Sequence, residues 1–264
     1  MGDLLRHWHV SLAEQSPVAV ATVVEGPQIG GKILVTPEDH VGSSGTDDLD
    51  RAIIEAARGM LEGGRTGTIH FGPRGQRRME DVAVFIQSFA PPPRMYVFGA
   101  IDFASAVARM GKFMGYRVTV CDARPVFATR ERFPTADEVV VAWPDEFLKT
   151  APVDKRTVIC VLTHDPKFDV PILVEALKTD AGYIGAMGSR RTHNNRTARL
   201  KEEGVADEEL RRISSPIGLD IGARTPEETA VAIAAEIIAL HTGHSGGRLA
   251  ERSGPIHARE SAAR

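Results

Sequence analysis

The chain has 264 residues, of which 42% are hydrophobic, and its formal net charge is -3 at pH 7. At about 100 to 200 residues per domain, this length predicts two domains. The nearly balanced charge gives no electrostatic reason to expect binding to nucleic acid or to a membrane. The opening MGDLLRHWHV lacks an apolar run of signal-peptide length, and the apolar stretch AVAIAAEIIAL is interrupted by Glu236, so we expect a cytoplasmic protein.

Residues 1–90 predict a small β-rich α/β domain. Its strands are expected at VAVATVVEG, KILVT, TGTIHFG and DVAVFIQSF, which are rich in β-branched residues. One amphipathic helix is expected at DDLDRAIIEAARGMLEGG. The prolines of PPPR, residues 91–94, can neither continue a helix nor donate hydrogen bonds within a sheet, so this segment predicts a linker.

The next part of the chain, residues 95–242, alternates between short apolar runs and amphipathic segments. Strands are expected at MYVFG, RVTVC, DEVVVAW, TVICVLT and GYIGAM, and helices at 102–114, 166–178, 189–203 and 226–241. This alternation predicts a Rossmann-like α/β domain with a parallel sheet covered on both faces. Residues 243–264 hold few large apolar side chains and predict a disordered tail.

The two cysteines give no sign of a disulfide or a metal centre. Cys121 and Cys160 lie in apolar strand-like runs, where a small buried thiol is the usual role of cysteine. The chain has no CxxC or HExxH spacing, so we expect no metal site.

In an open parallel sheet, ligands bind at the carboxyl ends of the strands, where the winding direction reverses. The loop GAID follows the first strand, and its Gly99 can supply a tight turn. Ile101 stands where the backbone of a dinucleotide-binding turn must come close to the pyrophosphate. Asp102 places a negative charge at a helix N-terminus, where it repels a phosphate. Asp122 stands where a ribose-binding acid is expected, although it can equally pair with Arg124. We therefore expect NAD(P) to bind weakly.

The loop THDP follows the fourth strand of the predicted sheet. Asp165 before Pro166 predicts a helix N-cap with proline at the first helical position. Capping does not require His164, which is expected to face the crevice and could titrate near neutral pH, bind an anion or bind a metal. A packed surface histidine is the alternative.

The loop after the fifth strand begins GSRR. Ser189 is the expected N-cap, which places Arg190 and Arg191 at the positive end of a helix, where cations are disfavoured. A bound anion would remove this conflict, and Gly185 and Gly188 would let backbone amides approach it. Solvated arginines that tolerate the helix dipole are the alternative.

Three runs resemble one known family closely. TVICVLTHDPKFDVPILVEAL, GYIGAMGSRRTHNNRTARLKEEGV and SSPIGLDIGARTPEETAVAIAAEIIAL resemble the C-terminal Rossmann domain of the xanthine dehydrogenase accessory family (XdhC/CoxI). ATVVEGPQIGGKILV followed by VGSSGTDDLD is similar to the N-terminal domain of that family. The resemblance covers about residues 17–241.

The resemblance implies a cofactor-maturation factor rather than an enzyme. Such a protein binds the molybdopterin form of the molybdenum cofactor while a cysteine desulfurase helps to install a terminal sulfur. It then delivers the cofactor to a molybdenum hydroxylase of the xanthine dehydrogenase or CO dehydrogenase type. The resemblance also suggests a homodimer, and it would place the pterin phosphate at Arg190 and Arg191, with His164 in the same crevice. There are two alternatives: an NAD(P)-dependent oxidoreductase, which Asp122 favours, and a purely structural or regulatory protein.

Two stretches depart from the pattern of the family. The chain reads GSSGTDDLD where the family commonly has GSxxGGCxE, so Asp48 replaces a cysteine. It reads GAIDFA where the family commonly has GAGHVA, so Ile101 and Asp102 replace a glycine and a histidine. These departures predict a divergent branch with the same architecture and altered ligand chemistry.

Overall fold

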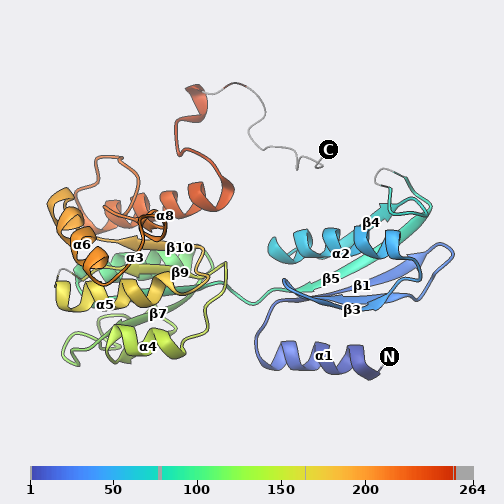
Figure 1. Cartoon of the computed structure of the whole chain (residues 1–264), viewed down its shortest axis with the longest axis horizontal. Coiled ribbons are helices and arrows are strands. Elements are labelled where there is room, and N and C mark those ends of the chain that lie inside the picture. Colours follow the sequence, from blue (N-terminus) through green and yellow to red (C-terminus); the bar gives the residue numbers. More distant parts are fainter. Residues whose placement is uncertain (1, 77–78, 164, 252, 254–264) are drawn as a thin grey trace. The chain divides into compact units, whose positions relative to one another are not determined.

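The computed structural model describes residues 2–76, 79–163, 165–251 and 253. The chain divides into two compact units, residues 1–91 and 92–264, and each is described by itself. Figure 1 shows the elements of both units. Among the described residues, no helix combines the length and the apolar character needed to cross a bilayer.

The first unit is built on an antiparallel sheet with the strand order β3-β2-β1-β5-β4. The strands are β1 (Val18–Glu25), β2 (Lys32–Val35), β3 (His40–Ser43), β4 (Gly67–Phe71) and β5 (Val82–Phe89). Helix α2 (Asp47–Glu62) packs on one face and helix α1 (Gly2–Ala13) on the other (Figure 1). Three aspartates in the first turn of α2 stabilise its positive end, and its buried Leu49, Ile53 and Ala57 face the sheet.

The second unit contains a six-stranded parallel sheet with the order β11-β10-β9-β6-β7-β8. Its strands are β6 (Arg94–Phe98), β7 (Arg117–Asp122), β8 (Glu138–Val141), β9 (Val158–Val161), β10 (Tyr183–Ala186) and β11 (Ile213–Ser214). This is the doubly wound order of dinucleotide-binding folds, and the winding direction reverses between β6 and β9. The fold class expected from the sequence is confirmed.

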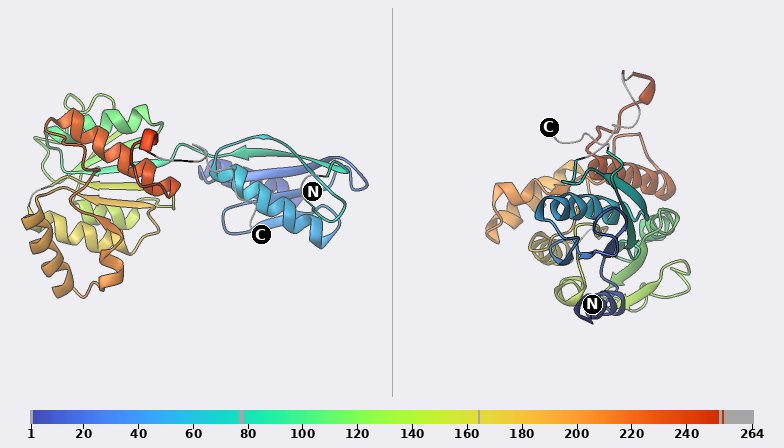
Figure 2. Two further views of the ribbon diagram at one scale, coloured as in Figure 1. Left: turned by 90° about the horizontal axis from the view of Figure 1, so that it is seen from above. Right: turned by 90° about the vertical axis from the view of Figure 1, so that its right-hand side faces the viewer.

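Helices cover both faces of the parallel sheet. The helices are α3 (Asp102–Phe113), α4 (Pro144–Thr150), α5 (Pro166–Leu177), α6 (Arg190–Glu202), α7 (Asp207–Leu210) and α8 (Pro226–Thr242). Helices α3 and α8 pack together on one face, while α4, α5 and α6 cover the other, as the view in Figure 2 shows. Each face therefore has its own buried apolar cluster, and the loops at the carboxyl ends of the strands are left to form a site.

All of the expected strands and helices are present, and the elements that were not expected are mainly short. The structure adds α1, β3, α4, α7 and β11, of which all but α1 have seven residues or fewer. The described part of the expected tail, 243–251 and 253, is exposed and contains one short turn, Leu249–Glu251. Its remaining residues lie outside the described part of the chain, so tail disorder stays a prediction.

The cysteine prediction is confirmed. Cys121 and Cys160 are free thiols, and both are buried. Burial raises the pKa of each thiol to about 12, so both are protonated at neutral pH. A protonated buried thiol is a poor nucleophile, which argues against a covalent role for either cysteine.

These thiols and the phenol of Tyr96 predict a loss of stability in alkaline solution. Burial raises the pKa of Tyr96 to about 12, so the folded state holds its protons above the pH at which the unfolded chain releases them. The free energy of unfolding should keep its full value below about pH 9 and should fall as the pH rises toward 12. Urea denaturation at pH 8 to 11 measures this fall. Replacing both cysteines by alanine should lessen it, and a midpoint that stays constant to pH 11 would contradict the interpretation.

Candidate functional site

The turn after β6 lies at the point where the winding direction reverses. Gly99 is buried and has a φ of +99°, a conformation that L side chains rarely adopt. A Cβ at Gly99 would lie 2.9 Å from the backbone nitrogen of Thr163. Only glycine fits this turn, because the segment after β9 packs directly against it.

Asp122, the last residue of β7, binds the backbone of this turn. Its carboxylate accepts the backbone N–H of Ala100 at 2.7 Å and the Nε–H and Nη2–H of Arg124 at 2.9 and 2.8 Å. Burial opposes ionisation, but the bonds from Arg124 and Ala100 outweigh it and hold the pKa of Asp122 below its usual value. The pairing with Arg124 that the sequence suggested is present. It leaves an amide of the glycine turn bound to a carboxylate of the protein itself.

The start of α3 is acidic. Ile101 is the N-cap residue and makes no side-chain capping bond, and the Asp102 side chain is 90% exposed. Asp102 lies 3.4 Å from Arg132 Nη2, which balances part of its charge. Beside Asp122, this second carboxylate makes the turn unfavourable for a phosphate.

The loop THDP leads from β9 into α5. His164 lies outside the described residues, so its predicted orientation stays a prediction. Asp165 is the N-cap of α5, where its carboxylate accepts the backbone N–H of Lys167 at 3.0 Å. The capping role expected for Asp165 is confirmed.

The turn that leads into α6 is held by glycine and serine. Gly188 has a φ of +150°, and a Cβ there would come within 2.9 Å of the Thr192 side chain. Ser189 is the N-cap, as expected, and its hydroxyl accepts the backbone N–H of Thr192 at 3.1 Å. Arg190 and Arg191 are the first two residues of the helix, and both are exposed.

The charges of these two arginines are not balanced locally. The first turn of α6 has no acidic residue, and within the described part of the chain neither Arg190 nor Arg191 has a carboxylate partner within 4 Å. Two cations at the positive end of a helix raise the energy of the empty site. An anion bound between them would lower it.

Beneath the turn lies a buried ion pair that the sequence analysis did not anticipate. Arg196 is 5% exposed, and its Nη2 donates to Asp169 Oδ2 at 2.7 Å and to the backbone oxygen of Met187 at 2.7 Å. Asp169 is 1% exposed and also bonds the hydroxyl of Thr163. These contacts join α5, α6 and the segments that follow β9 and β10. One available signal was an aspartate on the otherwise apolar face of α5.

A cavity of about 180 Å³ lies between α5 and α6, directly above this ion pair. Its lining consists of Pro166, Asp169, Arg191, Thr192, Asn195, Arg196 and Arg199. Arg191, Asn195 and Arg199 are spaced four residues apart, so they lie along one face of α6. We call this cavity the arginine pocket. Three guanidinium groups and one carboxylate give it a positive balance, which suits a small anion.

The structure brings together only some of the site residues expected from the sequence. Arg191 lines the arginine pocket, and Gly188, Ser189 and Arg190 form the turn at its edge. Gly99 contacts Thr163, whose hydroxyl bonds Asp169 below the pocket. Among the described residues, no group of three or more His, Cys, Asp or Glu side chains could hold a metal ion.

The buried pair predicts a large and specific loss of stability. Asp169→Ala should lower the free energy of unfolding by about 3 to 5 kcal/mol, because it leaves the Arg196 charge buried without its carboxylate. The control is Asp165→Ala in the same helix, which removes only a capping bond worth about 0.5 to 2 kcal/mol. Urea denaturation measures both. Equal losses would show that the ion pair does not hold this part of the fold.

Comparison with known protein families gives two matches. The model of the XdhC Rossmann domain matches residues 95–237, and the model of the XdhC and CoxI family matches residues 11–72. The first match covers the parallel sheet with the arginine pocket, and the second covers most of the first unit.

Two relatives are each similar over part of this chain. A probable xanthine dehydrogenase subunit of Bacillus subtilis is 36% identical over 155 residues, which are 59% of this chain and 45% of that protein. The molybdenum cofactor insertion chaperone PaoD of Escherichia coli is 28% identical over 156 residues, which are 59% of this chain and 42% of that protein. The chain thus spans less than half the length of these curated relatives.

A solved structure shares the fold. A crystal structure described as a xanthine dehydrogenase of Bacillus halodurans matches with a TM-score of 0.53 and 19% identity, over 94% of this chain and 98% of that chain. At this identity the likeness concerns the fold alone.

Proposed function

This chain belongs to the XdhC and CoxI family, and on that premise we propose that it binds the molybdenum cofactor in its molybdopterin form. It protects the cofactor, assists its sulfuration and promotes its insertion into a molybdenum hydroxylase of the xanthine dehydrogenase or CO dehydrogenase type. The partners are the hydroxylase apoenzyme and a cysteine desulfurase, and the acting form is a homodimer. The likeness to the insertion chaperone PaoD supports this role.

The observation that carries the proposal is the unbalanced charge at the start of α6. Molybdopterin ends in a phosphate, and a phosphate is the ligand best suited to a helix N-terminus flanked by guanidinium groups. Arg190 and Arg191 grip the phosphate at the edge of the arginine pocket, and Gly188 lets the backbone approach it. Arg199, one turn beyond Asn195, extends the positive surface along α6.

The sulfur chemistry does not pass through a thiol of this chain. Asp48, which stands where the family commonly has cysteine, is exposed at the start of α2 and lies 3.8 Å from Arg51. Cys121 and Cys160 are buried and protonated at neutral pH, so neither is suited to carry a persulfide. In the proposed role, the cysteine desulfurase transfers sulfur to the cofactor while this chain only holds it.

The alternative, an NAD(P)-dependent oxidoreductase, receives less support. Asp122 stands where a ribose-binding acid is expected, but its side chain is 4% exposed, and Arg124 and Ala100 donate hydrogen bonds to its carboxylate. Asp102 adds a negative charge at the helix that would face the pyrophosphate. A dinucleotide would have to displace these internal contacts in order to bind.

The arginine turn gives the main test of the cofactor site. Replacing Arg190 and Arg191 together by alanine should weaken molybdopterin binding at least tenfold, because each lost charge-assisted hydrogen bond is worth about 1.5 to 3 kcal/mol. The midpoint of urea denaturation should stay level or rise, because the two cations no longer oppose the helix dipole. Calorimetric titration measures the affinity.

The control for that experiment is Arg51→Ala, an exposed arginine of the first unit, which should change neither quantity. A double variant that binds molybdopterin as tightly as the parent, or that unfolds more readily, would show that the arginines have a structural role instead.

Nicotinamide dinucleotides should bind weakly. We expect NAD and NADP to show dissociation constants above about 1 mM, because Asp122 occupies the Ala100 amide and Asp102 repels a phosphate. Asp102→Asn, which removes one negative charge, should tighten binding slightly. Micromolar binding to the parent protein in a calorimetric titration would favour the oxidoreductase.

A further inference from the structure

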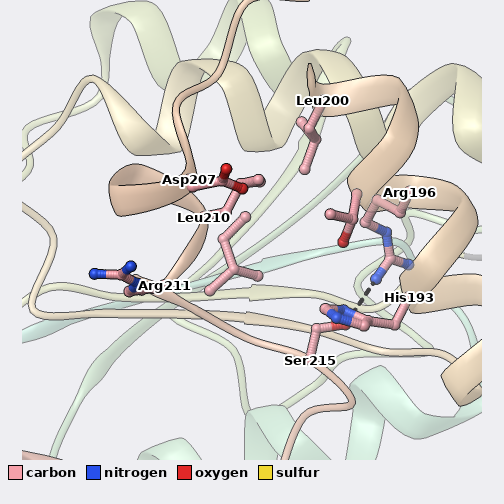
Figure 3. Close-up of a pocket in the computed structure, with 9 residues that line it drawn as sticks. His193, Arg196, Leu200, Asp207, Leu210, Arg211 and Ser215 are labelled. Carbon is pink, nitrogen blue, oxygen red and sulfur yellow. Dashed lines mark hydrogen bonds between the residues drawn. The ribbon is translucent and has the colours of Figure 1, made fainter. Parts of the chain in front are cut away.

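A second pocket, of about 370 Å³, lies on a neighbouring face of α6, between that helix, α7 and β11. Figure 3 shows it, with His193 and Ser215 beside the Arg196 guanidinium and with Leu200 and Leu210 directed into the space between the helices. We call it the α6–β11 pocket. Its volume falls within the range of small-molecule sites, and its residues include none of those assigned above to the cofactor except Arg196.

One wall of this pocket is apolar. Leu200 is buried on α6, while Leu210 and Ile213 are half-buried on the segment that follows it. Such a wall gives a ligand an apolar surface to cover, which is the main source of binding free energy for a small organic molecule.

The other wall carries hydrogen-bonding groups with unused capacity. Arg196 donates from Nη1 to the Ser215 hydroxyl at 3.1 Å, so the proton of that hydroxyl is left to bind a ligand. Within the described part of the chain, the side chains of His193 and Thr197 have no hydrogen-bond partner, whereas the unpaired donor Arg196 Nε is buried below the surface of this wall. Unpaired polar groups that converge beside an apolar wall are the usual arrangement of a binding site.

The electrostatics favour a ligand with a single negative charge. Arg196 brings a buried positive charge to this wall, but Asp169 already balances that charge from the opposite side. At the rim, Arg211 pairs with Glu208 at 2.9 Å and Asp207 pairs with Lys201 at 2.6 Å, so neither adds a free charge. A phosphate dianion would find its second cation, Arg211, already paired with Glu208, whereas a carboxylate can accept from the Ser215 hydroxyl that Arg196 polarises.

We propose that the α6–β11 pocket binds a small organic carboxylate. The carboxylate accepts hydrogen bonds from Ser215 and Thr197 near the Arg196 charge, and the apolar body packs on Leu200 and Leu210. This site shares only Arg196 with the arginine pocket, and the proposal does not depend on the proposed cofactor site. Because Arg196 also bonds Asp169 and the oxygen of Met187, a ligand here would contact the same residue that supports the arginine pocket.

The test uses benzoate as the probe and benzamide as its neutral counterpart of the same shape. Titrations of the full chain followed by nuclear magnetic resonance should show benzoate binding with a dissociation constant of about 1 mM, a usual affinity for so small a ligand. Benzamide should bind at least tenfold more weakly, and inorganic phosphate should not bind in this pocket. Equal affinity for benzoate and benzamide, or stronger binding of phosphate here, would overturn the proposal.

Two variants assign the site. Thr197→Val keeps the shape of a half-exposed side chain and removes its hydroxyl, and Ser215→Ala removes the polarised donor; each should weaken benzoate binding about tenfold. Arg190→Ala should leave benzoate binding unchanged, which separates this site from the cofactor site. Unchanged affinity in Thr197→Val and Ser215→Ala, or no binding of benzoate to the parent chain, would also overturn the proposal.

Discussion

The ion pair between Arg196 and Asp169 is the interaction on which the candidate sites depend. A buried guanidinium needs a carboxylate and several hydrogen-bond acceptors, because a single contact does not offset the free energy lost when the charge is removed from water. Here Asp169 on α5, Met187 at the end of β10 and Ser215 after β11 supply them. The pair therefore fixes α6 relative to the sheet, and the arginine pocket and the α6–β11 pocket lie on two faces of one anchored helix.

An internal ion pair also forms at the turn after β6, but there it occupies the position where a ligand would bind. Asp122 is engaged by Arg124 and by the Ala100 amide, so the turn that binds phosphate in many Rossmann folds is closed by an internal anion. Among the described residues, no acid plays that part at the first turn of α6, and Arg190 and Arg191 remain available. The anion site that we propose for this domain therefore lies after β10 rather than after β6.

Sequence reasoning predicted the features that depend on local chemistry. Runs of β-branched residues gave the long strands, and the pair Asp165–Pro166 gave the start of α5 because capping and proline geometry act within one turn. It missed β3, whose sequence HVGS has no strand pattern, and it missed the partnership of Asp169 with Arg196. Those two residues are 27 positions apart on different helices, so only the packed fold brings them together. The α6–β11 pocket was missed for the same reason, because its lining residues come from separate elements that face one another only after folding.

The identity of the ligand that accompanies the chain tests the central claim most directly. The protein should be purified from a molybdenum-replete host, and the small molecules released on denaturation should be identified by mass spectrometry. We predict a phosphorylated pterin in an amount comparable with the protein, and a much smaller amount from the variant that lacks Arg190 and Arg191. A nicotinamide dinucleotide in its place, or the absence of any pterin, would contradict it.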